Sequence, residues 1–450
     1  MSSFITQYQH LKLISSFVKK KFRHFGVNKK QEIIRLVYEI CKRENLKPQT
    51  VLKDLPVGEF HALKDYLVCR RFPIAYAHNQ TRTLHLPKLK LDKSKIFAAS
   101  SKDFYPRKII VEKRVRDSVL TKKFTSYFPD AKLKEIDTLK SFIKKYRCLK
   151  AFDYNHRTDT VIIIHQPADF FKRCPCTKYA VGCNYNIFNL SFGCIFECTY
   201  CFLQEYTNSP GILFPANLDS FFEAFKNYVG NFKRLGSGEF SDSLMLDNVT
   251  EYSQEIIAFF KKYPSVLFEF KTKSCQINNL LSARHKGNIV VGWSFNPECI
   301  IKENEFYTAS LQQRLIAAQK CVQADYKIAC HFDPIIYFQD WRKEYENLIE
   351  KIFNYLKPKD IAWISLGTLR FNPALKTIIE TRFPLNRILD AELVYGYDRK
   401  LRYPDVLRRD IYQYMIRLLK KHNKNIPVYL CMENVNMWRL VGLSLPQQII

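Results

Sequence analysis

The 450-residue sequence lacks any long uninterrupted apolar segment, although 47% of its residues are hydrophobic. No stretch approaches the roughly 18 consecutive apolar residues of a membrane-spanning helix. Residues 1–26 also lack the apolar core of a secretory signal. They contain more lysine than arginine, which argues against an organellar presequence. We therefore expect a cytoplasmic protein with no membrane partner.

Acidic residues are scarce, and the first one in the chain is Glu32. The whole sequence has 71 Lys and Arg against 43 Asp and Glu, a formal net charge of +28. The excess is densest in residues 1–100, which carry 20 basic and 7 acidic side chains. Neutralising phosphates releases counterions, so this balance favours a nucleic-acid partner. The alternative is a solvated basic surface. Residues 1–100 show no helix-turn-helix or zinc-finger signature.

Because the sequence lacks a secretory signal, we expect its 14 cysteines to lie in a reducing compartment. Clustered thiols in such a compartment bind metal more often than they form disulfides. Three of them, Cys194, Cys198 and Cys201, follow an apolar, aromatic run and a glycine in the spacing C-x3-C-x2-C. Thiolates are the usual ligands of iron–sulfur clusters, and a full set is normally four. Three thiolates on one loop can bind three irons of a [4Fe–4S] cube and leave the fourth iron open for a cofactor or substrate.

This loop, with Tyr200 before the last cysteine, resembles the cluster loop of radical S-adenosylmethionine (SAM) enzymes. The longer stretch CTYCFLQEYTNSPGILFPANLDSFFEAF is similar to the corresponding region of the spore photoproduct lyase family, DNA photolyase-like radical SAM proteins. The similarity continues through KTKSCQINNLLSARHKG, VVGWSFNPECII and YKIACHFDPIIYFQDWRKEY, and it covers roughly residues 104–440. The cysteine spacing alone is moderately specific; the ordered series of motifs is much more so.

Strand-like and helix-like segments alternate between residues 185 and 371, which predicts a parallel sheet in an α/β protein. The expected strands are 185–192, 234–240, 266–273, 289–296, 326–336 and 361–371. The family resemblance implies that they curve into a partial (β/α)6 radical SAM barrel. We predict four segments: a basic, mostly helical extension (1–100), a small α/β unit (101–183), the barrel (184–375) and a C-terminal α/β or helical extension (376–450). In the small unit, we expect a helix over residues 132–146.

Polar residues follow several of the expected strands, where the chemistry of such barrels takes place. The resemblance implies that SAM is bound by a set of residues at these strand ends: Gly238, Glu239, Ser241, Asp242, Lys273, Ser294 and Asn296. A carboxylate and hydroxyl groups suit the ammonium and ribose of SAM, and a lysine suits its carboxylate. Singly, each of these side chains is equally well explained as a strand-end cap or an ion-pair member.

The implied reaction is reductive cleavage of SAM to methionine and a 5′-deoxyadenosyl radical, which takes a hydrogen atom from the substrate. An electron donor such as flavodoxin or ferredoxin is then required, and the substrate implied is DNA that carries a photoproduct. The resemblance makes Tyr200 and Glu239 the candidate catalytic residues. Two differences from the lyase pattern affect the step in which the enzyme returns a hydrogen atom and quenches the radical. Phe202 stands where the lyases have a tyrosine, and Glu239 aligns with their hydrogen-donating cysteine.

Two other classes of function stay open. The chain is a radical SAM enzyme that acts on RNA, a peptide or a small molecule, or it is a non-catalytic nucleic-acid-binding protein. In the second case, Cys174 and Cys176 would join Cys198 and Cys201 in a structural zinc site. Cys183 follows the first two of these, and we interpret Cys174, Cys176 and Cys183 as structural thiols.

Overall fold

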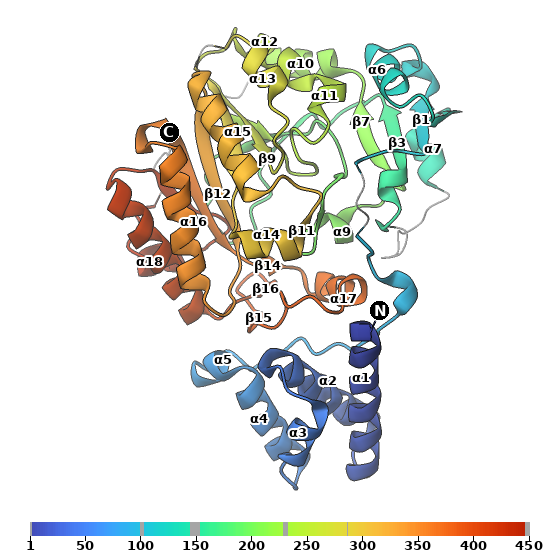
Figure 1. Cartoon of the computed structure of the whole chain (residues 1–450), viewed down its shortest axis with the longest axis vertical. Helices are drawn as coiled ribbons and strands as arrows, with labels where there is room; N and C mark the ends of the chain where they lie inside the picture. Colours follow the sequence, from blue (N-terminus) through green and yellow to red (C-terminus); the bar gives the residue numbers. More distant parts are fainter. Residues whose placement is uncertain (1, 100–102, 145–153, 228–232, 286, 446–450) are drawn as a thin grey trace. The chain divides into compact units, whose positions relative to one another are not determined.

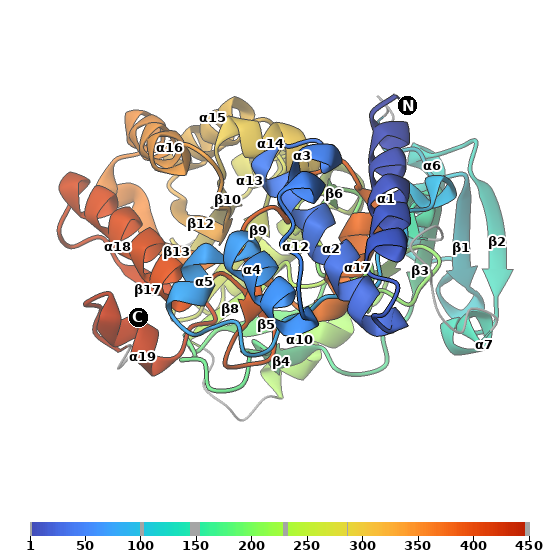
Figure 2. The ribbon, with the colours of Figure 1, turned by 90° about the horizontal axis from the view of Figure 1, so that it is seen from below.

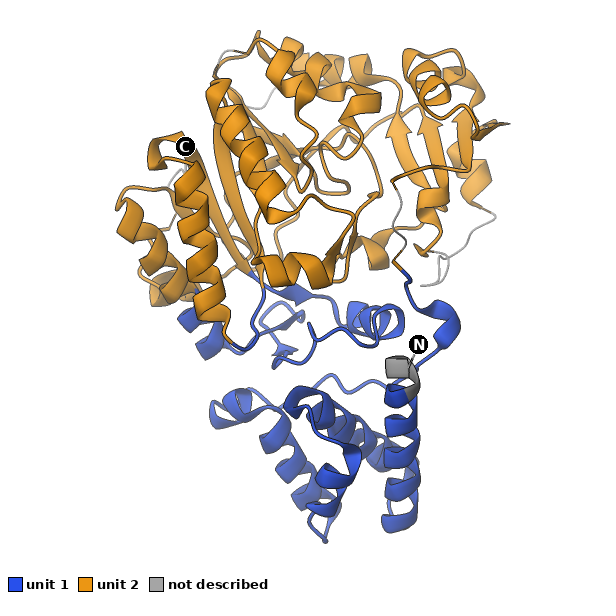
Figure 3. Cartoon of the chain, viewed as in Figure 1, with its two compact units in different colours: residues 1–98, 336–339, 368–411 blue, residues 99–335, 340–367, 412–450 orange. Residues whose placement is uncertain are grey.

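The computed structural model of the protein describes residues 2–99, 103–144, 154–227, 233–285 and 287–445. The chain forms two compact units, which Figure 3 shows in different colours. The first unit contains residues 1–98, 336–339 and 368–411, and the second contains residues 99–335, 340–367 and 412–450. Both units are therefore assembled from segments that are far apart in the sequence.

A curled sheet forms the centre of the second unit. Within the described residues its eight strands follow the order β17-β13-β12-β10-β9-β8-β5-β4. Their bounds are β4 Phe171–Arg173, β5 Asn186–Phe188, β8 Arg234–Ser237, β9 Leu267–Thr272, β10 Ile289–Ser294, β12 Lys327–Ile335, β13 Ile361–Thr368 and β17 Val428–Leu430. Strands β5, β8, β9, β10 and β12 pair in parallel, as do β13 and β17, while β4 is antiparallel to β5.

The strands expected from the sequence correspond to β5, β8, β9, β10, β12 and β13. All residues of β8 and β10 are buried, as expected for a parallel sheet whose two faces are both covered. The segments after the two edge strands meet, because Val181 N donates to Glu433 O at 2.8 Å and Ala180 forms an antiparallel bridge with Asn434. The predicted α/β class with a parallel-rich sheet is therefore confirmed.

Helices cover the outside of this sheet. Helix α15 packs against β10 and β12, and α16 packs against α15, as Figure 1 shows. The other helices of the second unit contribute large apolar side chains, such as Phe221, Phe225 and Phe260. The bounds are α9 Leu203–Tyr206, α10 Leu218–Lys226, α11 Asp247–Thr250, α12 Tyr252–Phe260, α13 Asn278–Ser282, α14 Glu298–Asn304, α15 Leu311–Gln323, α16 Trp341–Tyr355 and α19 Val435–Leu440. Short 3-10 turns are η3 Arg157–Asp159 and η4 Pro358–Asp360, and α18 spans Asp405–His422.

A smaller parallel sheet of the order β2-β1-β3-β7 also belongs to the second unit. Its elements are β1 Lys108–Glu112, η2 Lys113–Val115, α6 Val119–Tyr127, β2 Lys132–Ile136, α7 Leu139–Ile143, β3 Thr160–Ile164 and β7 Ile212–Pro215. The helix predicted over residues 132–146 is wrong in its first part, because residues 132–136 form β2. This strand lies at the sheet edge with four of its five residues exposed, so its backbone pairing with β1 overrides the helical preference of Lys, Leu and Glu.

The first unit combines the N-terminal helices with a later segment. The helices are α1 Ser2–Lys21, α2 Val27–Glu44, α3 Pro48–Lys53, α4 Phe60–Arg71 and α5 Pro73–Ala77, followed by η1 Lys93–Lys95. The later segment holds β14 Arg370–Phe371, α17 Pro373–Arg382, β15 Val394–Tyr395 and β16 Leu401–Arg402. Helices α1 and α4 both pack against α2 (Figure 2).

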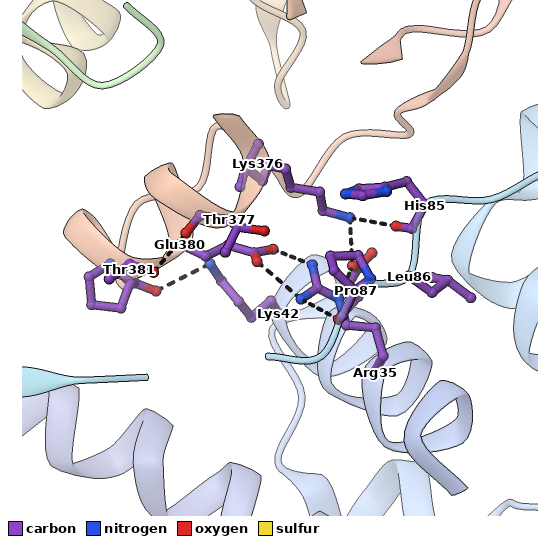
Figure 4. Close-up of polar contacts among 12 residues, drawn as sticks. Arg35, Lys42, His85, Leu86, Pro87, Lys376, Thr377, Glu380 and Thr381 are labelled. Atoms are coloured by element: carbon purple, nitrogen blue, oxygen red, sulfur yellow. Dashed lines mark hydrogen bonds and ion pairs between the residues drawn. The ribbon is translucent and has the colours of Figure 1, made fainter. Parts of the chain in front are cut away.

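Buried ion pairs hold the first unit together. Glu39 lies 2.6 Å from Arg35, 2.8 Å from Arg71 and 2.8 Å from Lys376, so that one carboxylate of α2 meets cations from three helices. Figure 4 shows Arg35 directed at Glu380 of α17, and Lys376 of the same helix beside the backbone of His85. Burial raises the pKa of Glu39, but Lys376, Arg35 and Arg71 together hold this pKa well below its usual range.

We predict that Glu39→Gln lowers the free energy of unfolding at pH 7 by about 3–5 kcal/mol, because it leaves buried cations without their anion. The depressed pKa means that this contribution is present above about pH 4.5 and is lost as Glu39 becomes protonated at lower pH. Chemical denaturation at several pH values measures it. The matched control is Glu59→Gln at an exposed position, for which we expect a change within about 0.5 kcal/mol. Equal effects of the two substitutions would contradict the prediction.

Candidate functional site

The three-cysteine loop begins at Gly193, whose φ of +97° lies in a region that L side chains rarely adopt. Its amide donates to Phe240 O at 2.8 Å, which ties the loop to the segment after β8. Cys194 follows directly, Cys198 lies in the short strand β6 (Glu197–Cys198), and Cys201 lies shortly before α9. Cys194 and Cys198 are buried, Cys201 is half-buried, and none of the three forms a disulfide.

A buried arginine holds the first half of this loop. Arg157 Nε donates to Cys194 O at 3.1 Å, and its Nη2 donates to Phe196 O at 2.7 Å. Its Nη1 lies 2.7 Å from Glu197 Oε2, and both side chains are 2% exposed. The guanidinium therefore satisfies two loop carbonyls and pairs with the one loop carboxylate, which fixes the backbone that carries the thiols.

The second half of the loop is held by neutral groups. Gln204 Nε2 donates to the carbonyls of Cys198, Thr199 and Cys201 at 3.1, 2.9 and 3.2 Å. Thr199 Oγ1 donates to Asn304 Oδ1 at 2.7 Å. Strand β6 pairs with β11 (Glu305–Phe306). The loop carbonyls are thus bound by the chain itself.

Burial raises the pKa of all three thiols, that of Cys194 to about 12 and that of Cys198 well above its ordinary value. Without a metal these thiols are neutral at pH 7, and metal coordination would deprotonate them. Within the residues that the structure describes, no three His, Cys, Asp or Glu side chains converge closely enough to hold a single metal ion. A zinc ion draws its ligands to one centre, whereas each thiolate of an iron–sulfur cube binds a different iron.

The residues after β8 form a tight turn. Gly238 has φ +97°, and a Cβ there would lie 2.9 Å from Ser243 Oγ and 3.0 Å from Lys271 O, so only glycine fits. Glu239 Oε2 lies 2.7 Å from Lys172 Nζ of β4. Burial raises the pKa of Glu239, and the ion pair with Lys172 only partly offsets this rise.

Asp242 connects the ends of β8 and β9. Its Oδ1 accepts from Leu244 N at 3.0 Å and from Thr272 Oγ1 at 2.7 Å, and its Oδ2 accepts from Lys273 N at 2.5 Å. Burial raises the pKa of Asp242. Both carboxylate oxygens are therefore already used by the chain, and the side chain fixes the backbone of Lys273.

A second buried ion pair lies beside β6. Glu305 Oε2 is 2.6 Å from Arg314 Nη2, and Glu305 Oε1 accepts from Asn296 Nδ2 at 2.9 Å and from Tyr200 OH. Burial raises the pKa of Glu305, but Arg314 and Lys273 lower it to about 2. The carboxylate is therefore ionised, and it lies next to Cys198 in the β6–β11 pair.

Some predicted SAM-binding side chains keep free polar atoms and others do not. Asn296 is engaged at both ends, because its Oδ1 accepts from Tyr345 OH at 2.8 Å. In contrast, the side-chain hydroxyls of the buried residues Ser241 and Ser294 make no hydrogen bond within the described ranges. The same is true of Lys273 Nζ, which also has no ion pair within 4 Å. Burial lowers the pKa of Lys273, but Glu305 and Cys198 raise it above its usual value, so the ammonium is retained.

The structure also gathers the cysteines that precede the loop. Contact with Cys176, burial and the neighbouring Cys431 and Cys183 all raise the pKa of Cys174. Cys431 comes from the other edge of the sheet, directly after β17. Sequence patterns therefore missed the fourth member of this group, as they missed Arg157, Gln204, Glu305 and Arg314 around the three-cysteine loop. Only Gln204 carried a local signal, since it belongs to the motif CFLQ after the last cysteine.

The comparisons with known proteins place the chain in a family. A family model named "Spore photoproduct lyase" matches residues 104–425. The spore photoproduct lyase of a Geobacillus species is 27% identical over 241 residues, which cover 52% of this chain and 69% of the relative. That of Bacillus subtilis (strain 168) is 25% identical over 308 residues, which cover 64% and 86%.

Solved structures give the same result. A mutant spore photoproduct lyase with bound AdoMet and dinucleoside spore photoproduct aligns with a TM-score of 0.62 and 25% identity, over 73% of this chain and 100% of that chain. Another spore photoproduct lyase, complexed with dinucleoside spore photoproduct, aligns with a TM-score of 0.61 and 25% identity, over the same shares. The fold and the matches thus define a radical SAM enzyme, a lyase. Because the family model matches well over half of the sequence, the chain belongs to the spore photoproduct lyase family. The family and the radical SAM lyase class that the sequence predicts are both confirmed.

We predict that Arg157→Met lowers the free energy of unfolding by about 3–5 kcal/mol, because it breaks the buried ion pair with Glu197. Amide hydrogen exchange across residues 194–201 should also accelerate, since two loop carbonyls lose their donor. The control is Arg116→Gln, which breaks an ion pair with Glu135 (3.0 Å) in which the arginine is 57% exposed. We expect it to cost less than about 1 kcal/mol. Unchanged exchange in the loop of the Arg157 variant would show that the arginine does not hold it.

Proposed function

We propose that the protein is a radical SAM enzyme that repairs a photoproduct in DNA. The observation that carries this proposal is the loop of three cysteines, two buried and one half-buried, whose carbonyls all accept hydrogen bonds from the chain while the thiols remain available. The complexes of related lyases with AdoMet and dinucleoside spore photoproduct support the cofactor and the class of substrate. The curled sheet then corresponds to the partial (β/α)6 barrel.

Cys194, Cys198 and Cys201 are the proposed ligands of a [4Fe–4S] cluster. Their burial fits such a group, because a cluster ionises thiols that the protein alone keeps neutral. Arg157 and Gln204 bind the loop carbonyls and so fix the positions of the three sulfurs without occupying them.

The proposed SAM site follows from the side chains that keep free polar atoms. Lys273 supplies a buried cation for the SAM carboxylate, and Ser241 and Ser294 supply hydroxyl groups. Gly238 permits the turn that presents Glu239. Asp242 and Asn296 act as positioning residues, since their side chains bind Lys273 N and Glu305. When bound, the cluster and SAM supply reductive cleavage of a carbon–sulfur bond and abstraction of a hydrogen atom.

Tyr200 and Glu239 remain the proposed catalytic residues, each with a chain partner. The hydroxyl of Tyr200 donates to Glu305, which orients its ring beside the loop. Glu239 pairs with Lys172, whose ammonium also lies 4.3 Å from the ring centroid of Phe240. Phe202 has no hydroxyl, and its ring packs against Tyr206 at 5.6 Å between centroids. The group that returns a hydrogen atom therefore differs from that of the lyases with a cysteine and a tyrosine at these positions.

The remaining partners are proposed on chemical grounds. A one-electron donor such as flavodoxin or ferredoxin is needed to reduce the cluster. Among the described residues, no helix combines the length and the apolar character that crossing a bilayer requires. The cytoplasmic location and the division at residues 100, 183 and 375 stay predictions.

The decisive experiment is anaerobic reconstitution followed by incubation with SAM, a reductant and ultraviolet-irradiated DNA. We predict that wild type binds iron, releases 5′-deoxyadenosine and removes a photoproduct. Cys194→Ser, Cys198→Ser and Cys201→Ser should each lose most of the iron and the SAM cleavage. The matched control, Cys299→Ser, should behave like wild type. A protein that holds zinc and no iron would instead indicate a structural site, and SAM cleavage without DNA repair would indicate a different substrate.

We also predict that Lys273→Met weakens SAM binding by about tenfold to a hundredfold, because a charge-assisted hydrogen bond to a carboxylate contributes about 1.5–3 kcal/mol. Equilibrium binding of SAM to the reconstituted protein measures this effect, with Lys302→Met at an exposed position as the control. Iron content should be the same in both variants. If SAM affinity stays unchanged while iron is retained, Lys273 does not bind the cofactor.

A further inference from the structure

The family match begins at residue 104, so helices α1–α5 of the first unit lie before the part that this chain shares with the lyases. They nevertheless form a folded bundle, because side chains such as Ile14, Leu36, Val51 and Leu67 are at most 1% exposed in one apolar core. This bundle must therefore be explained by something other than the chemistry of the three-cysteine loop.

The cations of this bundle fall into two groups. The buried ones, such as Arg35 and Arg71, are paired with Glu39, and Arg35 is also paired with Glu380. A group of exposed ones lies where α1 ends and α2 begins. We name this surface the α1–α2 corner, and it consists of the exposed Lys19, Lys20, Lys21, Arg23 and Lys29 together with the half-buried Lys30.

Residues 19–30, which span the α1–α2 corner, contain no carboxylate side chain, because the first acidic residue of the sequence is Glu32. Glu32 is itself paired with Lys64 at 2.7 Å. Across the described residues, none of the six cations has an acidic partner within 4 Å. Their polar contacts are with backbone oxygens, from Lys21 Nζ to Leu55 O at 3.4 Å and from Lys30 Nζ to Arg23 O at 3.0 Å.

Helix stability explains only half of this arrangement. Lys19, Lys20 and Lys21 occupy the last turn of α1, where cations are favoured by the helix dipole. Lys29 and Lys30 occupy the first turn of α2, where the same dipole disfavours cations and where no acidic residue is present. Because the end of α1 is followed closely by the start of α2, positive charge is concentrated there, and this charge destabilises the first turn of α2. A bound polyanion would offset that destabilisation.

We propose that the α1–α2 corner binds the phosphate backbone of duplex DNA. This inference rests on the proposed function, since DNA is the substrate proposed there, but it assigns the contact to a surface outside the family match. Exposed lysines and arginines without carboxylate partners neutralise phosphates and release counterions, so the contact is independent of base sequence and sensitive to salt. The corner thereby increases the occupancy of long DNA without taking part in the reaction.

The test replaces charge rather than deleting the bundle, because α2 and α4 contribute Glu39 and Arg71 to buried ion pairs and a truncated chain would lose them. The corner variant is Lys19→Gln, Lys20→Gln, Arg23→Gln and Lys29→Gln in the full chain. The control variant removes the same charge from exposed sites of the second unit: Lys122→Gln, Lys261→Gln, Lys262→Gln and Lys302→Gln.

Affinity for an undamaged duplex is measured over a range of salt concentrations. We expect the corner variant to lose at least tenfold in affinity at low salt, and its dependence of log K on log salt to become shallower by about 3–4 units. The control variant should stay within about twofold of wild type. Equal losses in the two variants would overturn the proposal, as would tighter binding of the corner to RNA or to anionic vesicles than to duplex DNA.

A second measurement needs no variant. Duplex DNA should protect Lys19, Lys20 and Lys29 of the wild-type protein from acylation, while Lys261 and Lys262 react as before; unprotected corner lysines would overturn the proposal. Cleavage of SAM with a dinucleoside substrate separates the two proposals. If that reaction fails but the corner still binds duplex DNA, the proposed function falls and this inference stands.

Discussion

The cost of burying charge governs the structure around the three-cysteine loop. Two arginines, Arg157 and Arg314, are almost completely buried, and each meets one carboxylate of the paired strands β6 and β11. Glu197 and Glu305 belong to those strands, so the two ion pairs lie on either side of the loop backbone. An unpaired charge at either position would be strongly destabilising, which restricts the loop to the conformation that satisfies both pairs.

This constraint extends from the loop to the strand ends. Glu305 accepts from Tyr200 and Asn296 and lies near Lys273, while Asp242 binds the backbone of Lys273 from the end of β8. The residues that the sequence suggested as SAM ligands therefore serve two different purposes. Lys273, Ser241 and Ser294 keep free polar atoms. Asp242 and Asn296 instead bind neighbouring groups of the chain and fix their positions. A rigid site of this kind suits chemistry in which a reactive species must meet one hydrogen atom and no other.

The sequence predicted six of the eight strands described in the large sheet, and the loop, because both signals are local. The apolar runs of β9 and β10 and the C-x3-C-x2-C spacing can be recognised without knowing what packs against them. The hydrogen bonds that hold the loop could not be predicted, since Tyr200 and Glu305 are separated by 105 positions and Arg157 precedes Cys194 by 37. The error at residues 132–136 has the same origin. Lys132–Ile136 has helix-forming composition, and only its parallel neighbour β1 makes it a strand.

Because the first unit is built from segments far apart in the sequence, it cannot fold completely early in synthesis. Helices α2 and α4 are made early, yet Lys376 and Glu380, which complete their charge pairing, leave the ribosome more than 300 residues later. Until then Arg35 lacks its contact with Glu380, and Glu39 lacks its contact with Lys376. Helices α2 and α4 are therefore synthesised long before α17, and the unit to which they belong cannot finish folding until α17 has emerged.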